Sequence, residues 1–317
     1  MLALHNEAHH LAELRACLER QNYPSERLQI IAVDDRSMDA TPELLREYCS
    51  WKYVRVAHVS PSHSPKKFAL ATGIAHSQSE LIVLTDADCR PGPDWIKTLV
   101  TQFQAECIAV AGFSPVFSRS KVLSQVLCID SVAVAAMSMA GIGWKKPIMA
   151  TGRNLAYRRS AFEAAGGFGQ TAQVLSGDDD LLLQRLAVAQ LGTIAFACDT
   201  AAHVPSQGPE TFFAWLVQKR RHISASKHFN FRIQLGYSVF HLCNLLLWLA
   251  PLFIAASGFL FFLLKCCVDL IVMRYASRRL QFKLRWQYFP LWEFSHVLIH
   301  TLIGPTSFFG KIKWRAA

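Results

Sequence analysis

The sequence has little charge for its length and lacks the cysteine patterns of metal sites and disulfide frameworks. Charged residues make up 18% of the 317 residues, hydrophobic residues make up 52%, and the mean hydropathy is +0.21. A soluble domain has about 25% charged residues, so a disordered chain and an ordinary soluble protein are both disfavoured. The nine cysteines include no Cys-x-x-Cys pair, which disfavours a disulfide scaffold and a structural zinc site.

Acidic residues are scarce toward the C-terminus. Residues 1–200 contain 19 Lys and Arg against 20 Asp and Glu, whereas residues 201–317 contain 14 against 3. The formal net charge of +10 therefore arises in the C-terminal part alone. A nucleic-acid-binding protein with an evenly basic surface is disfavoured, and we expect no nucleic-acid partner.

Charge is missing altogether from residues 233–264. This run of 32 residues exceeds the ~20 that span a bilayer. Pro251 and Gly258 interrupt it, which favours a helical hairpin over one long span. The predicted helices lie near residues 235–250 and 254–273, with a weaker third candidate at 288–309.

A basic segment without acidic residues follows the second predicted helix, at residues 274–285. Such a segment belongs on the cytoplasmic side, near anionic lipid headgroups. Because a hairpin returns the chain to its starting side, we expect residues 1–232 to form a cytoplasmic domain and residues 233–317 a multi-pass region in the cell membrane. Lys265 and Asp269, four residues apart, are predicted to pair on one helix face.

Strand and helix patterns alternate over the first 200 residues, which predicts an α/β domain with a doubly wound, mostly parallel sheet. Carboxylates follow two of the predicted strands, Asp34 and Asp35 after the first and Asp86 and Asp88 after the second. Ligands of such sheets bind beyond the carboxyl ends of the strands. Residues two apart face the same way, so Asp86 and Asp88 can share a divalent cation. The alternative is that the acidic residues only end strands and cap helices.

Two further motifs lie downstream. In Asp178-Asp179-Asp180, one carboxyl is a candidate general base with a raised pKa, although a simple helix cap is the alternative. The segment from Gln218 to His222 contains Lys219, Arg220 and Arg221, whose charge suits either a diphosphate or a lipid surface.

In this order, the motifs resemble the family 2 glycosyltransferases, inverting nucleotide-sugar enzymes with a GT-A fold. The resemblance covers roughly residues 3–230, and trailing membrane helices are common in the family. The matching motifs are His5-Asn6-Glu7, Asp34-Asp35, Lys66, Asp86-Ala87-Asp88, Arg153-Asn154, Gly177-Asp178-Asp179, and Gln218 with Arg221.

The resemblance implies a role for each motif. Asp88 would ligate Mg²⁺ or Mn²⁺ on the donor diphosphate, and Asp86 would face the nucleotide. Lys66 and Arg221 would stabilise the charge on the leaving diphosphate. Asp179 would be the catalytic base. The remaining nucleotide-sugar contacts would come from Glu7, Asp34, Asp35, Arg153, Asn154 and Gln218, and the acceptor region would include Asp178 and His222.

Two departures from the family pattern stand out. His222 occupies the position where the family has Trp, which favours single-sugar transfer over processive synthesis. Only about four residues precede Asn6, so we expect an incomplete first strand, an N-terminally truncated chain and poor stability.

The sequence thus predicts a membrane-bound inverting glycosyltransferase. It would move a sugar from a nucleotide-diphosphate sugar, a UDP-sugar by preference, to a lipid-linked or glycan hydroxyl at the cytoplasmic face. The alternatives are an inactive nucleotide-sugar-binding or scaffold protein and a nucleotidyltransferase.

Overall fold

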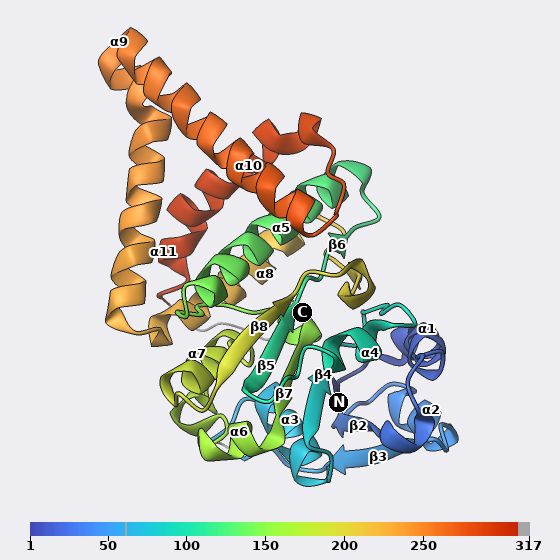
Figure 1. The fold of residues 1–317 in the computed structure, drawn as a ribbon. Coiled ribbons are helices and arrows are strands. Elements are labelled where there is room, and N and C mark those ends of the chain that lie inside the picture. The colour runs from blue at the N-terminus through green and yellow to red at the C-terminus, as the bar shows by residue number, and fades with distance from the viewer. Residues whose placement is uncertain (61, 310–317) are drawn as a thin grey trace. The chain divides into compact units, whose positions relative to one another are not determined.

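The computed structural model describes residues 1–60 and 62–309 (Figure 1). The chain divides into two compact units, and we describe each by itself. Residues 1–115 and 137–207 form the first unit, and residues 116–136 and 208–317 form the second. The sequence-based domain boundary near residue 232 stays a prediction.

The first unit is built on a mostly parallel sheet. Two groups of strands, in the orders β1-β2-β3 and β4-β7-β5-β8, are joined by main-chain hydrogen bonds of Met1 with Val83 and Thr85. All pairs within the groups are parallel except those of β7, which runs antiparallel to β4 and β5. The α/β fold predicted from the sequence is confirmed. The strands are β1 (Leu2–Leu4), β2 (Ile30–Asp35), β3 (Trp51–Val56), β4 (Leu81–Leu84), β5 (Cys107–Gly112), β7 (Leu155–Arg158) and β8 (Thr193–Ala197).

Helices cover both faces of this sheet because strand side chains alternate between the faces. Val110 and Ala156 pack in the core beside α1 (Ala8–Glu19), α2 (Thr41–Glu47) and α4 (Trp95–Val100). Ala109 and Leu155 pack in the core beside α3 (Pro65–Ala75), α6 (Arg159–Ala164) and α7 (Asp180–Val188). The carboxyl ends of β1, β2 and β4 lie at one edge of the sheet, where their loops can share a ligand.

The first strand is short but fully paired. Its three residues lie opposite Ala32, Val33 and Asp34 of β2, and the side chains of Leu2 and Leu4 are buried in the core. That the strand is incomplete stays a prediction.

A buried amide fixes the centre of the sheet. The Asn154 side chain is fully buried, and its Nδ2 atom donates to the carbonyls of Phe113 and Ala202, both at 2.8 Å. Its Oδ1 atom accepts a hydrogen bond from the indole of Trp95 at 3.0 Å. Gly112 leaves room for this amide, since a Cβ there would lie 2.4 Å from Nδ2.

The second unit is helical. The long helix α9 (Phe231–Arg279) departs from helical geometry at Ile254 and Ala255, three and four residues after Pro251, so it consists of two arms. Gly258 lies close to the Ala250 carbonyl at this bend. The other helices described in this unit include α8 (Phe212–Ser224), α10 (Phe289–Leu298), the π-helix η7 (Ile299–Ile303) and α11 (Gly304–Thr306).

In the part of the chain that the structure describes, two helices are long and apolar enough to cross a membrane. They are α5 (Lys121–Gly143), half of whose apolar window is buried, and α9, whose apolar window is only 6% buried. On α9, Lys265 and Asp269 pair at 2.9 Å, which confirms the predicted ion pair. The same ammonium also contacts Glu293 of α10.

Candidate active site at the carboxyl ends of the strands

The loops that follow β1 and β2 are held together by side chain to main chain hydrogen bonds. Asn6 has a left-handed backbone, with φ of 56°, and its Oδ1 atom accepts from the Met38 amide at 2.8 Å. The Ser37 hydroxyl accepts from the Asn6 amide at 2.9 Å. Asp39 accepts from the amides of Ala8 and Thr41 at 3.1 and 3.0 Å, respectively. These bonds fix the edge where the predicted nucleoside contacts Glu7, Asp34 and Asp35 lie.

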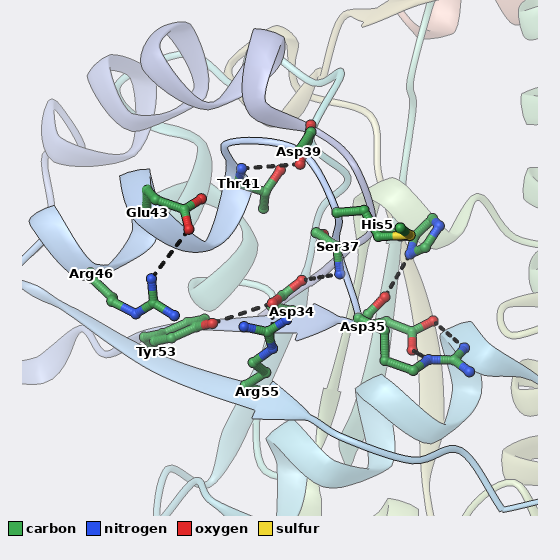
Figure 2. A network of polar contacts seen from close by, with 12 residues as sticks. His5, Asp34, Asp35, Ser37, Asp39, Thr41, Glu43, Arg46, Tyr53 and Arg55 are labelled. Carbon is green, nitrogen blue, oxygen red and sulfur yellow. Dashed lines mark hydrogen bonds and ion pairs between the residues drawn. The ribbon is translucent and has the colours of Figure 1, made fainter.

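The two carboxylates at the end of β2 have different surroundings (Figure 2). Asp34 is fully buried and accepts hydrogen bonds from the Ser37 amide at 2.9 Å and the Tyr53 hydroxyl at 3.2 Å. It also pairs with Arg55 at 3.5 Å, so its oxygens are engaged within the protein. Asp35 pairs with the half-exposed Arg36 at 2.8 Å and is the nearer of the two to solvent.

Lys66 connects two acidic motifs that are far apart in the sequence. Its Nζ atom, at the start of α3, lies 3.0 Å from Asp86 Oδ1 and 3.0 Å from Asp178 Oδ2. Burial alone would lower the pKa of Lys66, but the charges of Asp178 and Asp86 raise it above its ordinary value. Burial alone would raise the pKa of Asp178, yet Lys66 holds it below the ordinary value. The Lys66 ammonium and two carboxylates therefore meet beside the end of β4.

Main-chain amides position the carboxylates at the start of α7. Asp179 accepts from the amides of Asp180 and Gly152, both at 2.8 Å, and Asp180 accepts from the Ala150 amide at 2.9 Å. A Cβ on Gly152 would lie 3.1 Å from Asp178 Oδ2 and 3.2 Å from Asp179 Oδ2, so glycine permits this close approach. Burial and the charge of Asp178 raise the pKa of Asp179. A carboxylate with a raised pKa is suited to accept a proton.

Among residues 1–60 and 62–309, no lysine or arginine lies as close to Asp88 as Lys66 lies to Asp86. Burial and the charge of Asp86 raise the pKa of Asp88, and the more distant charge of Arg153 opposes this rise. Arg153 itself donates to the Ser114 hydroxyl at 2.8 Å. Two adjacent carboxylates offer the hard oxygen ligands that Mg²⁺ and Mn²⁺ prefer, and a cation would relieve their repulsion. The residues present therefore fit a divalent metal.

The structure brings some of the predicted residues together and separates others. Lys66 contacts Asp86 and Asp178, and the Gly152 amide holds Asp179 beside them. Asn154 is instead an interior residue whose hydrogen bonds all go to the protein. Gln218, Arg221 and His222 lie on α8 in the second unit, and their place in the site stays a prediction.

Lys67 is a residue that the sequence analysis missed. Its side chain is buried, and its Nζ atom donates to the carbonyls of Thr171 and Ser176 at 2.8 and 3.0 Å. Burial lowers the pKa of Lys67 to about 8. The lysine thus fixes the segment that leads into Asp178, and no motif in the sequence distinguishes it from Lys66.

Comparison with known proteins shows what this chain is similar to. Residues 1–166 match the model of the family described as glycosyl transferase family 2. The chain is 30% identical to the probable glycosyltransferase YdaM of Bacillus subtilis over 230 residues, which is 70% of this chain and 53% of that protein. It is 26% identical to a beta-monoglucosyldiacylglycerol synthase of Trichormus variabilis over 192 residues, 57% of this chain and 39% of that protein. The chain thus spans about half the length of these relatives or less.

A solved structure has a similar fold. It is the mannosyltransferase PcManGT of Pyrobaculum calidifontis, in complex with GDP-mannose and Mn²⁺. The TM-score is 0.56 at 19% identity, and the likeness covers 94% of this chain and 85% of that one. The GT-A fold predicted from the sequence is confirmed.

The Asp180→Asn substitution tests the electrostatics of the acidic cluster. Burial and the charge of Asp179 raise the pKa of Asp180 well above the ordinary value of 3.8. A carboxyl whose pKa is higher in the folded than in the unfolded chain costs stability above pH 3.8, and this cost grows until the pH passes the folded pKa. Because asparagine keeps an acceptor for the Ala150 amide, we expect Asp180→Asn to raise the stability of the full chain at pH 8 by about 1 kcal/mol or more.

The measurement is the unfolding of the full chain in detergent at pH 8 and pH 5, for the wild type and for Asp180→Asn. We expect the gain in stability to be smaller at pH 5. Asp199→Asn is the matched control, because Asp199 is exposed and also accepts a main-chain hydrogen bond, from Ala201. Equal gains at both pH values, or a loss at pH 8, would contradict the assigned electrostatics.

Proposed function

Since the chain belongs to glycosyl transferase family 2, we propose that it transfers a sugar from a nucleotide-diphosphate sugar to an acceptor hydroxyl, with inversion at the anomeric carbon. The observation that carries the proposal is the position of Lys66 between Asp86 and Asp178. It joins the end of a central strand, where this fold binds ligands, to the motif that contains the base.

The donor would bind across the carboxyl ends of β1, β2 and β4. Glu7, Asp34 and Asp35 surround the nucleoside position, with Asp34 acting through the turn that it holds. A UDP-sugar is the donor proposed on the family resemblance. Lys66, with Arg221 and Gln218 of α8, would meet the diphosphate. Asp86 and Arg153 would contribute to the nucleotide-sugar site, and Asn154 would act by keeping the strand beside Arg153 in place.

A divalent cation, Mg²⁺ or Mn²⁺, would be held by Asp88 and would supply positive charge to the diphosphate as it leaves. The conversion of an ester-linked diphosphate into a free one adds negative charge at its terminal oxygen. The Lys66 ammonium lies in the site to stabilise that charge, since its two carboxylate partners keep it protonated.

Asp179 would act as the general base. The acceptor oxygen forms a bond to the anomeric carbon while the bond from that carbon to the diphosphate oxygen breaks. The hydroxyl proton passes to the Asp179 carboxylate, and a nucleoside diphosphate departs from the opposite face of the sugar. The main-chain amides of Gly152 and Asp180 fix the orientation of this carboxylate, and Asp178 and His222 are assigned to the acceptor region.

The acceptor is proposed to be a lipid-linked or glycan hydroxyl at a membrane. Side chains along α9 are exposed and apolar, among them Leu246, Leu252 and Phe253, as expected for a helix that contacts lipid. A relative whose name specifies a glycolipid product supports this class of acceptor. The basic segment at residues 274–285 supports a cytoplasmic location for the first unit.

The direct test uses membranes that contain the full chain. Each nucleotide sugar of a panel is supplied with Mn²⁺ or Mg²⁺, and release of nucleoside diphosphate is measured. We expect metal-dependent release from one donor, with loss of at least ~10²-fold in Asp179→Asn, because a general base contributes about that much or more. Asp88→Asn should be impaired at every metal concentration tested, and Asp199→Asn serves as the control with full activity.

Donor binding without any turnover in the wild type would contradict the proposal and favour an inactive binding protein. Release of pyrophosphate from a nucleoside triphosphate would favour a nucleotidyltransferase. Full activity of Asp179→Asn would remove this residue from its role as base.

Membrane topology is tested with a natural thiol. Cys49 is exposed on the first unit, and Cys243 and Cys267 lie on α9. A membrane-impermeant maleimide should label the chain at Cys49 only after intact cells are broken, and Cys49→Ser should remove that label. Labelling of Cys49 in intact cells would contradict the cytoplasmic location, and a chain released from membranes by alkaline carbonate would contradict membrane insertion.

A further inference from the structure

Three histidines meet in the helical unit. His241 comes from the first arm of α9, His296 from α10 and His300 from η7. Each offers a ring nitrogen, and these nitrogens all lie within 4.8 Å of one another. The rings of His241 and His300 are stacked with centroids 4.0 Å apart, and those of His296 and His300 are 4.4 Å apart.

The backbone places two of these rings on one side of a helix. His296 and His300 are four residues apart, the spacing at which two helical histidines can bind one metal ion. His300 lies in a π-helical turn, Ile299–Ile303, where the i to i+5 bonding shifts the register of the side chains. Such turns are uncommon and are frequent at functional sites. The π-helical turn thus shifts the register of the helix face that carries the histidine cluster.

Aromatic side chains surround the cluster. The polar groups near it already have partners. The ring of Trp292 lies 5.1 Å from that of His296, and the ring of Phe240 lies 5.2 Å from that of His241. On the same face of α10, Glu293 is engaged by Lys265. Among residues 1–60 and 62–309, we find no hydrogen bond to a ring nitrogen of the three histidines. All three histidines are half-buried, and a bound metal ion would give one ring nitrogen of each a partner.

We propose that His241, His296 and His300 bind one divalent transition-metal ion of the Zn²⁺ class. Imidazole nitrogens suit Zn²⁺ and its neighbours better than Mg²⁺ or Ca²⁺, which prefer oxygen. A tetrahedral ion at ~2.0–2.1 Å from each nitrogen leaves one coordination position for water or another ligand. The site links the first arm of α9 to the C-terminal helices, and it is separate from the metal proposed at Asp88.

A nearby cation does not prevent this binding. Lys219 of α8 acts on His296 and His300 through its charge. Lys265 of α9 also acts on His296 in this way. Lys219 pairs with Asp130 at 2.6 Å and Lys265 pairs with Asp269 at 2.9 Å. The two cations that face a bound metal ion therefore each have an acidic partner.

The test measures the metal alone on the full chain in detergent, after removal of bound metal with a chelator. We expect one equivalent of Zn²⁺ to bind, to raise the unfolding temperature, and to be replaceable by Co²⁺ with the visible absorption of a tetrahedral Co²⁺ site. His241→Gln and His300→Gln should each weaken Zn²⁺ binding by at least tenfold and remove the Co²⁺ band. Because Mg²⁺ prefers oxygen ligands, it should neither displace Zn²⁺ from the three histidines nor remove the Co²⁺ band.

The matched control is His9→Gln, since Glu7, His9 and His10 form the other group of possible ligands found in the described residues. Retained Zn²⁺ binding in His9→Gln supports the proposal, and loss of binding there overturns it. A wild-type chain that binds no stoichiometric Zn²⁺ also overturns it and leaves the three rings as a stacked cluster. This wild-type result does not depend on whether a variant folds.

Discussion

The carboxylates at the ends of the central strands repel one another, and the arrangement depends on the ammonium of Lys66 that lies between two of them. Asp86 and Asp178 come from segments about ninety residues apart, and a single Nζ atom lies 3.0 Å from each. The main-chain amides of Gly152 and Ala150 compensate the next two carboxylates, Asp179 and Asp180. The charges of Arg153 and Lys66 only partly offset the burial of Asp88 and the charge of Asp86, so a divalent cation fits beside it.

In the helical unit, polar side chains within an apolar layer are likewise brought next to one another. Glu293 and His296 of α10 and His300 of the following π-helix η7 are spaced three and four residues apart, and α9 supplies a partner group for each of them. Lys265 from the second arm meets Glu293, while His241 from the first arm meets the two histidines. Polar side chains in such a layer persist where they are paired. The ion pair and the proposed metal site would therefore hold α10 to the two arms of α9.

Local patterns allowed much of this to be predicted from the sequence. Acidic residues directly after β-branched runs mark strand ends, so the positions of Asp34 and Asp86 followed from spacing alone. Lys265 and Asp269 paired as their separation of four residues predicts. The remaining features depend on tertiary contacts that no spacing encodes. The sequence predicts Asn154 as a sugar contact, but its side chain bonds Trp95 and two carbonyls in the core. His241 meets His300, which is 59 residues further along the chain.

The most direct measurement of the central claim is calorimetric titration of the full chain with UDP and GDP, without metal, in the wild type and in Lys66→Met. If Lys66 is the cation that receives the diphosphate, the variant should bind the preferred nucleotide at least tenfold more weakly, about 1.4 kcal/mol. Lys52→Met, at an exposed lysine, should bind as the wild type does. Equal affinity of Lys66→Met and wild type, or no binding of either nucleotide by the wild type, would contradict the account.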